Sequence, residues 1–372
     1  MGFLKHTGIS TDFNSARYHK ILCADYPDFL DEYLRLPILQ RLDGVTLLCG
    51  TDWTPLFKNR FYYSRLEHSV GTALIVWNFT HDKKQTLAGL FHDVSTPAFS
   101  HVIDFRNGDS LTQESTELNN QKMINEDLEL SELLFSHGIY KYEIDNYHRY
   151  PIADNNIPGL SADRLEYMFP SGCSLDAVWT MDEVERLYSQ VAVLENGDGL
   201  PELGFLDQQA AFEYMRKFIE VSMILQHNED KVAMQLLADI VSRALECKLI
   251  AEEQLFTISE KALVEKFDAL AKDNVDESFT RLYHTFRNMT VVQHTQEPLP
   301  DSYCVSDSVK KRYVNPLVKV GNESASSPAK AVRLSELNKE ADSCIKEFLS
   351  FADTQFGCVP WCCCAVCLWC MI

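Results

Sequence analysis

Apolar residues recur at intervals of three and four along most of this chain, which is the spacing of a helix face. From residue 65 a helix is predicted because apolar positions share one face: Leu66, Val70, Ala73, Leu74 and Trp77. A second helix is predicted over 84–94, and Pro97 is expected to end or bend it. Residues 25–42 follow the same spacing, with Pro37 marking a break between two short helices.

The same spacing predicts further helices over 111–126, 128–137, 159–169, 180–193, 206–227, 229–250 and 276–289. The exception is 301–335, where β-branched residues surround a Gly- and Ser-rich loop, so a small extended or hairpin element is expected there. A last helix is predicted near 334–352. We therefore expect an all-α fold, a helical bundle with additional C-terminal helices and a small mixed or β-hairpin element.

Composition is typical of a soluble globular protein and limits the partners. The 372 residues are 46% hydrophobic and 24% charged, enough for a full hydrophobic core. With 34 Lys and Arg against 54 Asp and Glu, the formal net charge is −20, so polymeric nucleic acid is not expected as a partner. A small phosphorylated substrate is compatible with this net charge, because cations or a metal ion close to the phosphate outweigh the field of distant carboxylates. No secretory signal and no run of 18 apolar residues occurs, so we expect a cytoplasmic protein.

Cysteine is concentrated at the C-terminus, where six of the twelve lie within residues 358–372. The other six stand singly, as expected of reduced, buried thiols in a cytoplasmic protein. Three interpretations of this Cys-rich tail stay open: a lipidated membrane tether, a soft-metal site, or an extension without function. The paired C-x-x-C spacing of a structural zinc site is lacking among Cys362, Cys363, Cys364 and Cys367.

A His-Asp pair inside an apolar run is the first indication of chemistry, in "LAGLFHDVSTPAFSHVIDF" (87–105). His92 and Asp93 are expected to be buried there, and a buried carboxylate without a partner costs on the order of several kcal/mol. A metal, an Arg or the neighbouring His must therefore compensate Asp93. The same dipeptide at His81 and Asp82 lies among polar residues, which fits a solvated helix start with Asp82 near an N-cap.

Two residues on other predicted helices complete a candidate metal site. Adjacent side chains such as His92 and Asp93 diverge by about 100° around a helix, yet both can reach one ion at the helix end. His68 in "SRLEHSVG" and Asp163 in "SADRLEYMF" are the best candidates for the further ligands. Taken singly, each has an ordinary explanation as a core or surface residue. The order His, His-Asp, Asp over three helices favours a metal site.

Four blocks in this order resemble the HD-domain metal-dependent phosphohydrolases, most closely the branch of the bacterial dGTP triphosphohydrolases and the animal SAM-and-HD-domain dNTP triphosphohydrolase. The blocks are "LPILQRLDGV" (36–45), "SRLEHSVGTA" (64–73), "AGLFHDVSTPAFSHVIDF" (88–105) and "SADRLEYMF" (161–169). The resemblance implies an HD-type helical bundle that hydrolyses a small phosphorylated nucleotide, and a homo-oligomer is plausible. We expect an HD core over 1–200, a helical extension over 201–298, a small mixed element and last helix over 299–357, and the Cys-rich tail over 358–372.

The resemblance also implies the metal ligands. They match a mixed imidazole and carboxylate set: His68, His92, Asp93 and Asp163. Such a set suits one divalent ion such as Mn, Fe, Mg, Ni or Zn. The ion would lower the pKa of water and act as a Lewis acid toward the phosphoryl group.

Roles for substrate binding and catalysis are implied in the same way. Arg65 and Arg164 match residues that contact phosphate, where a guanidinium would act as a forked donor, and Tyr167 matches a tyrosine against the sugar. Asp104 matches a carboxylate that works with an active-site histidine. His101 is either catalytic or a residue that caps a helix or supports a metal ligand.

Two positions depart from the family pattern. Thr96 stands where the family often has the second His of His-Asp-x-x-His, and Gln113 falls where a later catalytic His is expected. Neither side chain can shuttle a proton near neutral pH as imidazole does. The nearby candidates to replace it are His101, His148, Asp104 and Glu114. Three hypotheses stay open: a dNTP triphosphohydrolase, a phosphohydrolase for another phosphomonoester or phosphodiester, and a degenerate protein that binds nucleotide without turnover.

Overall fold

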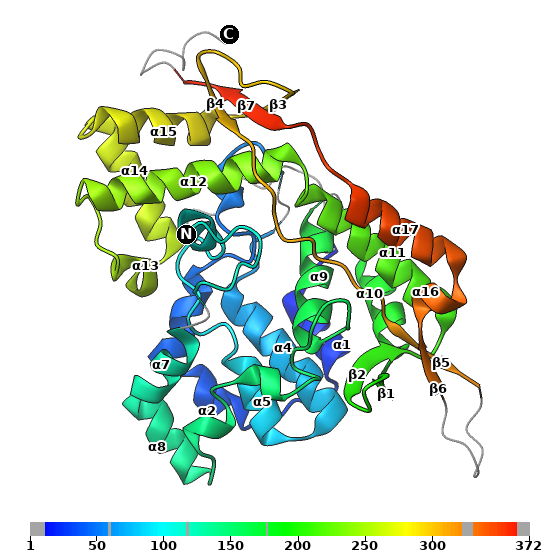
Figure 1. Cartoon of the computed structure of the whole chain (residues 1–372). Helices are drawn as coiled ribbons and strands as arrows, with labels where there is room; N and C mark the ends of the chain where they lie inside the picture. Colours follow the sequence, from blue (N-terminus) through cyan, green and yellow to red (C-terminus); the bar gives the residue numbers. More distant parts are fainter. Residues whose placement is uncertain (1–11, 59–60, 117–118, 176–177, 322–329, 363–372) are drawn as a thin grey trace.

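The computed structural model describes residues 12–58, 61–116, 119–175, 178–321 and 330–362. Figure 1 shows a helical body with two small sheets that lie well apart. The expected helix-rich architecture is therefore present. The all-α prediction is wrong, because seven strands form two sheets within the described ranges.

Helix α4 (Arg65–Thr80) is the central element of the N-terminal half. It begins at Ser64, where a capping box with Glu67 satisfies two backbone amides, and it ends at His81 in the left-handed conformation (φ 50°). It packs against α1 (Ser15–Leu22), α5 (Lys83–Leu90) and α9 (Ala162–Ser174). The helix predicted from residue 65 is confirmed.

Helix α5 differs from the helix predicted over 84–94. Asp82 caps its start by accepting from two backbone amides, which confirms the N-cap role expected there. The helix ends at Leu90, and residues 91–95 form turns in place of a last helical turn. The Asn120 side chain donates to the carbonyls of residues 91 and 92 and so holds this turn. His92 and Asp93 therefore lie in a turn after the helix and not on it.

The other elements of the N-terminal half are short: α2 (Leu30–Leu34), α3 (Pro37–Gln40), η1 (Arg41–Gly44), η2 (Thr51–Trp53), α6 (Val102–Arg106), α7 (Asn120–Glu126), α8 (Leu128–Ser136), η4 (Lys141–Glu143), η5 (Tyr147–Arg149) and α10 (Met181–Tyr188). The break expected at Pro37 is present, since Pro37 opens α3. The helix predicted over 111–126 begins only at residue 120. The Asp109 carboxylate accepts from the amides of residues 112, 114 and 115 and holds a turn instead.

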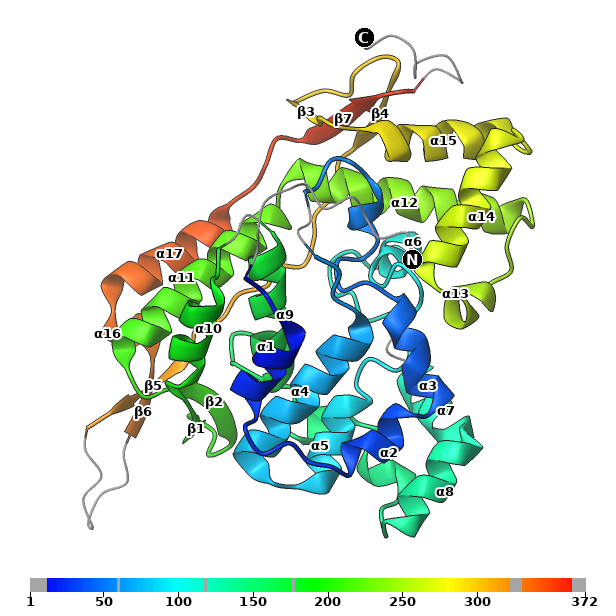
Figure 2. The same ribbon diagram turned by 180° about the vertical axis from the view of Figure 1, so that it is seen from behind.

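The C-terminal half contains the long helices α11 (Gln208–Ile224) and α12 (Asn228–Glu246), then α13 (Gln254–Thr257), α14 (Glu260–Lys272), α15 (Glu277–Asn288), α16 (Leu334–Leu337) and α17 (Lys339–Ser350). Helices expected over 206–227, 229–250 and 276–289 are confirmed, whereas α14 was not predicted. Buried residues form two cores, one around α4, α5, α9 and α11 and one around α6, α12, α14 and α15. Figure 2 shows these two groups from behind. The expected domain limits stay a prediction.

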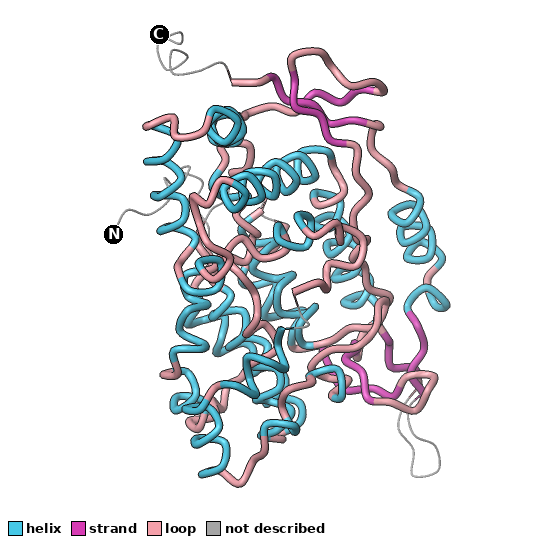
Figure 3. The backbone as a smooth tube through the Cα atoms, turned by 60° about the vertical axis from the view of Figure 1, so that its left-hand side comes forward, coloured by secondary structure: helices cyan, strands magenta, loops and turns pink. Residues whose placement is uncertain are grey.

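The two sheets draw strands from distant parts of the chain. The larger has the order β1-β2-β5-β6, with β2 parallel to β5 and the other neighbours antiparallel: β1 (Val191–Glu195), β2 (Pro201–Phe205), β5 (Leu317–Val320) and β6 (Lys330–Arg333). The smaller is antiparallel with the order β3-β7-β4: β3 (Gln293–Thr295), β7 (Phe356–Pro360) and β4 (Ser302–Val305). The extended element predicted over 301–335 thus divides between both sheets, and residues 306–316 run from one to the other (Figure 3).

One pair of cysteines departs from the expectation of single reduced thiols. Cys304 on β4 and Cys358 on β7 stand directly opposite in the antiparallel register and are joined by a disulfide. The prediction is therefore wrong for Cys304, because strand pairing brings together two residues that lie far apart in sequence. Most of the Cys-rich tail, residues 363–372, lies outside the described residues. Within the described ranges, no helix combines the length and apolar character that a membrane crossing requires.

Candidate metal centre

The four predicted metal ligands come from three elements and meet at one point. His68 lies in the first turns of α4, and Asp163 lies in the first turn of α9. The turn after α5 supplies His92 and Asp93. Because α4 packs against both α5 and α9, residues almost 100 positions apart in sequence become neighbours.

The donor atoms are spaced as the ligands of a single ion are. His68 Nε2 lies 3.1 Å from His92 Nε2 and 3.1 Å from Asp163 Oδ1, and His92 Nε2 lies 3.5 Å from the same oxygen. Asp93 Oδ2 lies 3.6 Å from His68 Nε2 and 3.7 Å from His92 Nε2. With bonds of about 2.0–2.2 Å to one ion, neighbouring ligand atoms stand roughly 3–3.5 Å apart. His68, His92 and Asp163 therefore have the mutual spacing that a divalent ion requires, and Asp93 lies beside both imidazoles.

Both imidazoles turn Nε2 toward this point. His68 Nδ1 bonds the Glu166 carboxylate, and His92 Nδ1 lies 2.7 Å from the Gly89 carbonyl. Each Nδ1 donates to its oxygen, so the neutral ring offers Nε2 as a metal ligand. Burial lowers the pKa of His68, but Glu166 and Asp163 outweigh it and raise that pKa to about 10. The negative charge around the two rings therefore favours a cation at this point, which is either a metal ion or a proton on Nε2.

Glu166 is the support behind His68. It is fully buried one turn after Asp163 and also accepts a hydrogen bond from the Tyr63 hydroxyl at 2.6 Å. Burial raises the pKa of the Glu166 carboxyl, and the contact with His68 opposes that rise. The close approach of α4 requires Gly71, because a Cβ there would lie 2.7 Å from Glu166 Cγ.

Asp93 is oriented by two side chains. Arg65 Nη1 donates to Asp93 Oδ2 at 2.8 Å, and Thr96 Oγ1 donates to Asp93 Oδ1 at 3.1 Å. Burial alone would raise the pKa of Asp93, but Arg65 and the two imidazoles outweigh it and hold the pKa below its usual range. Arg65 thus lies at the site as predicted, although its guanidinium contacts a metal ligand. Thr96, where the family often has histidine, takes a supporting position here.

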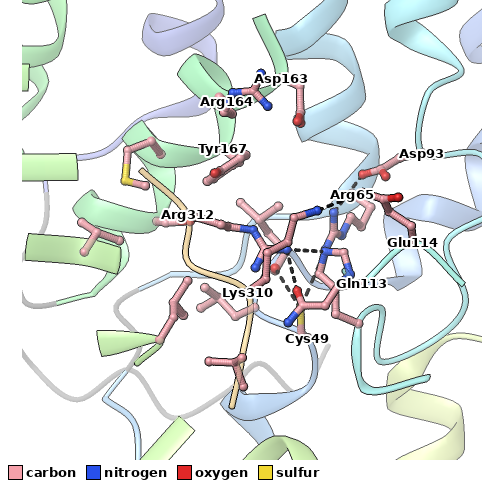
Figure 4. Close-up of a pocket in the computed structure, with 18 of the residues that line it drawn as sticks. Cys49, Arg65, Asp93, Gln113, Glu114, Asp163, Arg164, Tyr167, Lys310 and Arg312 are labelled. Atoms are coloured by element: carbon pink, nitrogen blue, oxygen red, sulfur yellow. Dashed lines mark hydrogen bonds and ion pairs between the residues drawn. The ribbon is translucent and has the colours of Figure 1, made fainter. Parts of the chain in front are cut away.

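A cavity of about 450 Å³ opens beside the donors. Figure 4 shows residues of its wall, including Arg65, Asp93, Asp163, Arg164 and Tyr167. Its remaining lining includes an apolar group from α6, the end of α11 and α12: Phe105, Val221, Ile224, Leu225 and Met234. Pockets of this size hold small-molecule ligands with a few polar groups that fix their orientation.

The two residues predicted to bind substrate from α9 differ in their partners. The Arg164 guanidinium bonds the loop before its own helix, through the carbonyls of Asn155 and Gly159 and an ion pair of 3.2 Å with Asp154. Its donors are thus directed at the protein. Tyr167 lies against the cavity, where burial raises its pKa to about 12. The substrate roles of both residues stay predictions.

The predicted catalytic pair is brought together. His101 Nδ1 lies 2.9 Å from Asp104, which is fully buried and also accepts from the Ser115 hydroxyl at 2.5 Å. His101 lines the cavity, so an imidazole oriented by a carboxylate faces it. Of the other named candidates, His148 and Glu114 also line the cavity.

The sequence reasoning missed three residues of the site. Glu166 lies inside the "SADRLEYMF" block one turn after Asp163, so its place on the same helix face was an available signal. Arg312 and Lys310 enter the cavity from the segment 306–316. The local signals were the basic residues of "KKRYVNP" and the resemblance of "RYVNPLV" (312–318) to the same family, and neither indicates contact with the N-terminal half.

A second group of donors lies at the start of α12 and is called the α12 cluster: His227, Glu229, His294 and Asp353. Three of them place ligand-type atoms within 4.8 Å of one another. His294 lies between the carboxylates, with Nδ1 2.9 Å from Asp353 and Nε2 2.9 Å from Glu229. His227 Nδ1 lies 3.2 Å from the second oxygen of Asp353. The carboxylates of this cluster are therefore already paired with imidazoles.

Comparison with solved structures places the fold in a known class. The chain superposes on a phosphohydrolase from Bacteroides thetaiotaomicron with a TM-score of 0.58 and 14% identity, over 89% of this chain and 95% of that one. A hypothetical protein from Aquifex aeolicus gives a TM-score of 0.57 and 14% identity, over 90% and 92%. The fold is thus one that a phosphohydrolase adopts, and it carries a His and Asp site suited to a divalent metal.

Two curated proteins resemble the sequence. The metal-dependent phosphohydrolase cns2 of Cordyceps militaris is 23% identical over 233 residues, which is 62% of this chain and 66% of that protein. The uncharacterized protein YdhJ of Bacillus subtilis is 29% identical over 139 residues, 37% of this chain and 41% of that protein. The matches thus span less than two thirds of each relative. No family model matches the chain.

Proposed function

We propose that this protein is a metal-dependent phosphohydrolase that acts on nucleotides, with deoxynucleoside triphosphates as the first candidates. The observation that carries the proposal is the convergence of His68, His92 and Asp163 at 3.1–3.5 Å, with Asp93 within 3.7 Å of both imidazoles and both Nδ1 atoms occupied elsewhere. The printed name of the Cordyceps relative and the fold of the Bacteroides structure support the same class. The dNTP substrate rests on the resemblance to the dGTP triphosphohydrolase branch.

The residues divide the work of hydrolysis. A divalent ion held by the four donors would supply Lewis acidity toward the phosphoryl group and lower the pKa of water. Arg65 holds the Asp93 carboxylate in place for that task. Arg312 and Lys310 bring positive charge to the cavity, which a polyphosphate requires in a chain of net charge −20.

The cavity also supports a nucleotide as the substrate. Its volume of about 450 Å³ and its apolar wall suit a nucleobase, while the metal donors and Arg312 suit the phosphates. Tyr167 lies at the cavity, where a sugar could contact its ring. The preference for one base or sugar is measured by comparing substrates in the experiment below.

The test is turnover by the purified full chain. It is incubated with Mn²⁺ and a panel of the four dNTPs, and the products are separated by chromatography. We expect turnover that disappears on chelation and in a His92→Ala, Asp93→Ala variant that still gives wild-type circular dichroism. Turnover that survives chelation, or none with any phosphorylated substrate, would sink the proposal.

Thr96 and Gln113 favour a second candidate, a degenerate protein that binds a nucleotide without turnover. The variant Thr96→His, Gln113→His restores the imidazoles expected from the family pattern. If the protein is degenerate, this variant hydrolyses dNTPs where the wild type does not. Equal, zero turnover by both proteins would speak against that candidate.

Two other expectations also stay proposals. A homo-oligomer is tested by light scattering of the full chain. The membrane tether is tested by fractionating cells that express a chain ending at Cys362, which keeps β7 and its disulfide intact. Unchanged partition between cytosol and membrane would dispose of the tether.

A further inference from the structure

Arg312 is held over the cavity by the residue that stands in the place of a catalytic histidine. Its Nη2 donates to Gln113 Oε1 at 2.6 Å and lies 3.4 Å from His101 Nε2. Gln113 is buried and is itself fixed, since its amide nitrogen donates to a backbone carbonyl at 3.1 Å. Figure 4 shows the Arg312 side chain reaching into the cavity from the segment 306–316.

This pair can neutralise charge but cannot deliver a proton. A guanidinium stays protonated at physiological pH, because its pKa lies above about 12. The amide of Gln113 is not an acid either. An imidazole at position 113 would instead be able to protonate a departing oxygen. At this place the site therefore offers a fixed positive charge and no proton donor.

The other imidazoles at the cavity do not supply the missing proton. His101 Nδ1 faces Asp104, and its Nε2 faces Arg312, which can only donate. The ring therefore holds one proton, on the side of Asp104, and presents an acceptor to the cavity. Burial is the main cause that lowers the pKa of His101, and Arg312 adds to it. His148 lies 3.3 Å from Asp154 with its side chain 57% exposed, so it belongs to the rim.

Resting on the proposed function, we propose that this site cleaves phosphoanhydride bonds and that Arg312 receives the leaving phosphate. A water oxygen forms the new bond to phosphorus and its proton passes to solvent. The bridging P–O bond breaks, and its electron pair stays on the departing phosphate. That phosphate leaves as an anion without a proton, because the pKa of a phosphate monoester is about 6.

A sugar leaving group would behave differently. Its alkoxide needs a proton as it departs, since an alcohol is about as weak an acid as water, with a pKa of about 15.7. The family resemblance alone predicts release of tripolyphosphate from a dNTP, which requires such an alkoxide. The Gln113 and Arg312 pair points instead to a nucleoside monophosphate with pyrophosphate, or a diphosphate with phosphate.

Product analysis is the first test. The full chain with Mn²⁺ is given dATP, dGTP, dCTP and dTTP, and the corresponding monophosphates as ester substrates. We expect nucleotide products with pyrophosphate or phosphate, and at least about 100-fold slower release of nucleoside from the monophosphates. Nucleoside and tripolyphosphate as the products would overturn the inference while upholding the proposed function. Absence of all turnover would overturn both.

Arg312 variants give the second test, with a readout that needs no metal. Arg312→Ala is expected to slow dNTP cleavage by roughly 100-fold, the usual effect of removing one charged donor from a transition state. It should also weaken binding of inorganic pyrophosphate to the metal-free protein in calorimetry, and Arg312→Lys should restore part of both. The matched control is Lys311→Met, because Lys311 donates to backbone carbonyls of residues 348, 349 and 351 and not to the cavity. Equal losses in both variants would show a folding effect and overturn the role of Arg312.

The third test returns the lost imidazole. Gln113→His is expected to raise nucleoside release from the ester substrates at least about tenfold relative to anhydride cleavage, with a new pH dependence near neutrality. Gln113→Leu, which keeps the size and loses the acceptor, should lower anhydride cleavage without that change in preference. If Gln113→His leaves the ratio of products and the pH profile unaltered, the inference is wrong.

Discussion

Among the described residues, two clusters combine histidine and carboxylate side chains, and they use their ring nitrogens differently. In the metal centre, His68 and His92 turn their Nδ1 atoms outward to Glu166 and to a carbonyl, so the two Nε2 atoms face each other at 3.1 Å. In the α12 cluster, both ring nitrogens of His294 lie 2.9 Å from a carboxylate. The first arrangement directs one nitrogen of each ring at a shared point, whereas the second uses both nitrogens of one ring to bond the surrounding carboxylates.

Closeness of donor atoms is therefore a weaker sign of a metal site than the partner of each imidazole's other nitrogen. Glu229 and Asp353 bond the two nitrogens of His294 and raise its pKa, Glu229 more strongly. At the metal centre, Glu166 and the Gly89 carbonyl fix both protons away from the ligands. Four predictions test this difference between the two clusters.

The largest effect is expected from removing a metal ligand. Asp163→Ala should lower bound metal from about one ion per chain to near zero, because the remaining donors lose the carboxylate that balances the charge. The matched control is Asp353→Ala, which removes the carboxylate of the α12 cluster. Metal analysis of the purified proteins decides the outcome. Equal metal loss in both variants would mean that the α12 cluster binds the ion too.

The next largest effect on metal binding is expected from Glu166, which bonds His68 Nδ1. Glu166→Gln keeps the size of the side chain but removes the charge that holds the Nδ1 proton, so Mn²⁺ affinity should fall roughly 10–100-fold. Calorimetric titration with Mn²⁺ measures the change. Glu229→Gln in the α12 cluster is the comparison and should leave the Mn²⁺ affinity at the wild-type value. An unchanged affinity in Glu166→Gln would contradict the role given to that carboxylate.

A smaller loss of Mn²⁺ affinity is expected when the hydroxyl of Thr96 is removed. Thr96→Val removes the hydroxyl that donates to Asp93, and a hydrogen bond to a charged group contributes about 1.5–3 kcal/mol. Because Arg65 still holds the other oxygen of Asp93, we expect about a tenfold weaker Mn²⁺ affinity. Thr96→Ser keeps the hydroxyl and should bind as the wild type does. A serine variant as weak as the valine variant would assign the effect to packing.

The smallest effect concerns stability and pH. The folded-state pKa of His294 is raised above its unfolded value, so its contribution is fully present below about pH 6.5 and is lost as pH rises through the folded pKa. The side chain is 32% exposed, and screening limits the contribution to less than about 1 kcal/mol. Urea unfolding of the wild type and His294→Gln should therefore differ more at pH 5.5 than at pH 9. A difference that grows with pH would reverse the assignment.

The sequence predicted best what depends on local spacing and block order. The helix from residue 65 and the helices α11, α12 and α15 follow from apolar periodicity, and the four donors are brought together as the block order indicated. The turn at His92 was not predicted, because the apolar pattern continues to Val94 while the helix stops at Leu90. The bonds of Asn120, thirty residues away, hold that turn.

Features set by distant pairing could not be predicted. The strands β1 and β2 lie between two segments whose apolar residues have helical spacing. What defines them as strands is their pairing with each other and with β5. The Cys304–Cys358 disulfide follows from the register of β4 and β7. Arg312 meets Gln113 only because the chain returns from the smaller sheet to the larger one across the cavity. No local pattern encodes these contacts.

The position of Arg312 in the segment 306–316 also has a consequence for the order in which the site is synthesised. All four metal donors lie at or before residue 163, whereas Arg312 is added far later. At about 5–20 residues per second, the ribosome needs roughly 7–30 s to pass from one to the other. A growing chain can thus complete its ligand set well before the side chain that receives the leaving phosphate exists. On the proposed mechanism, efficient hydrolysis therefore begins only after residue 312 has been added.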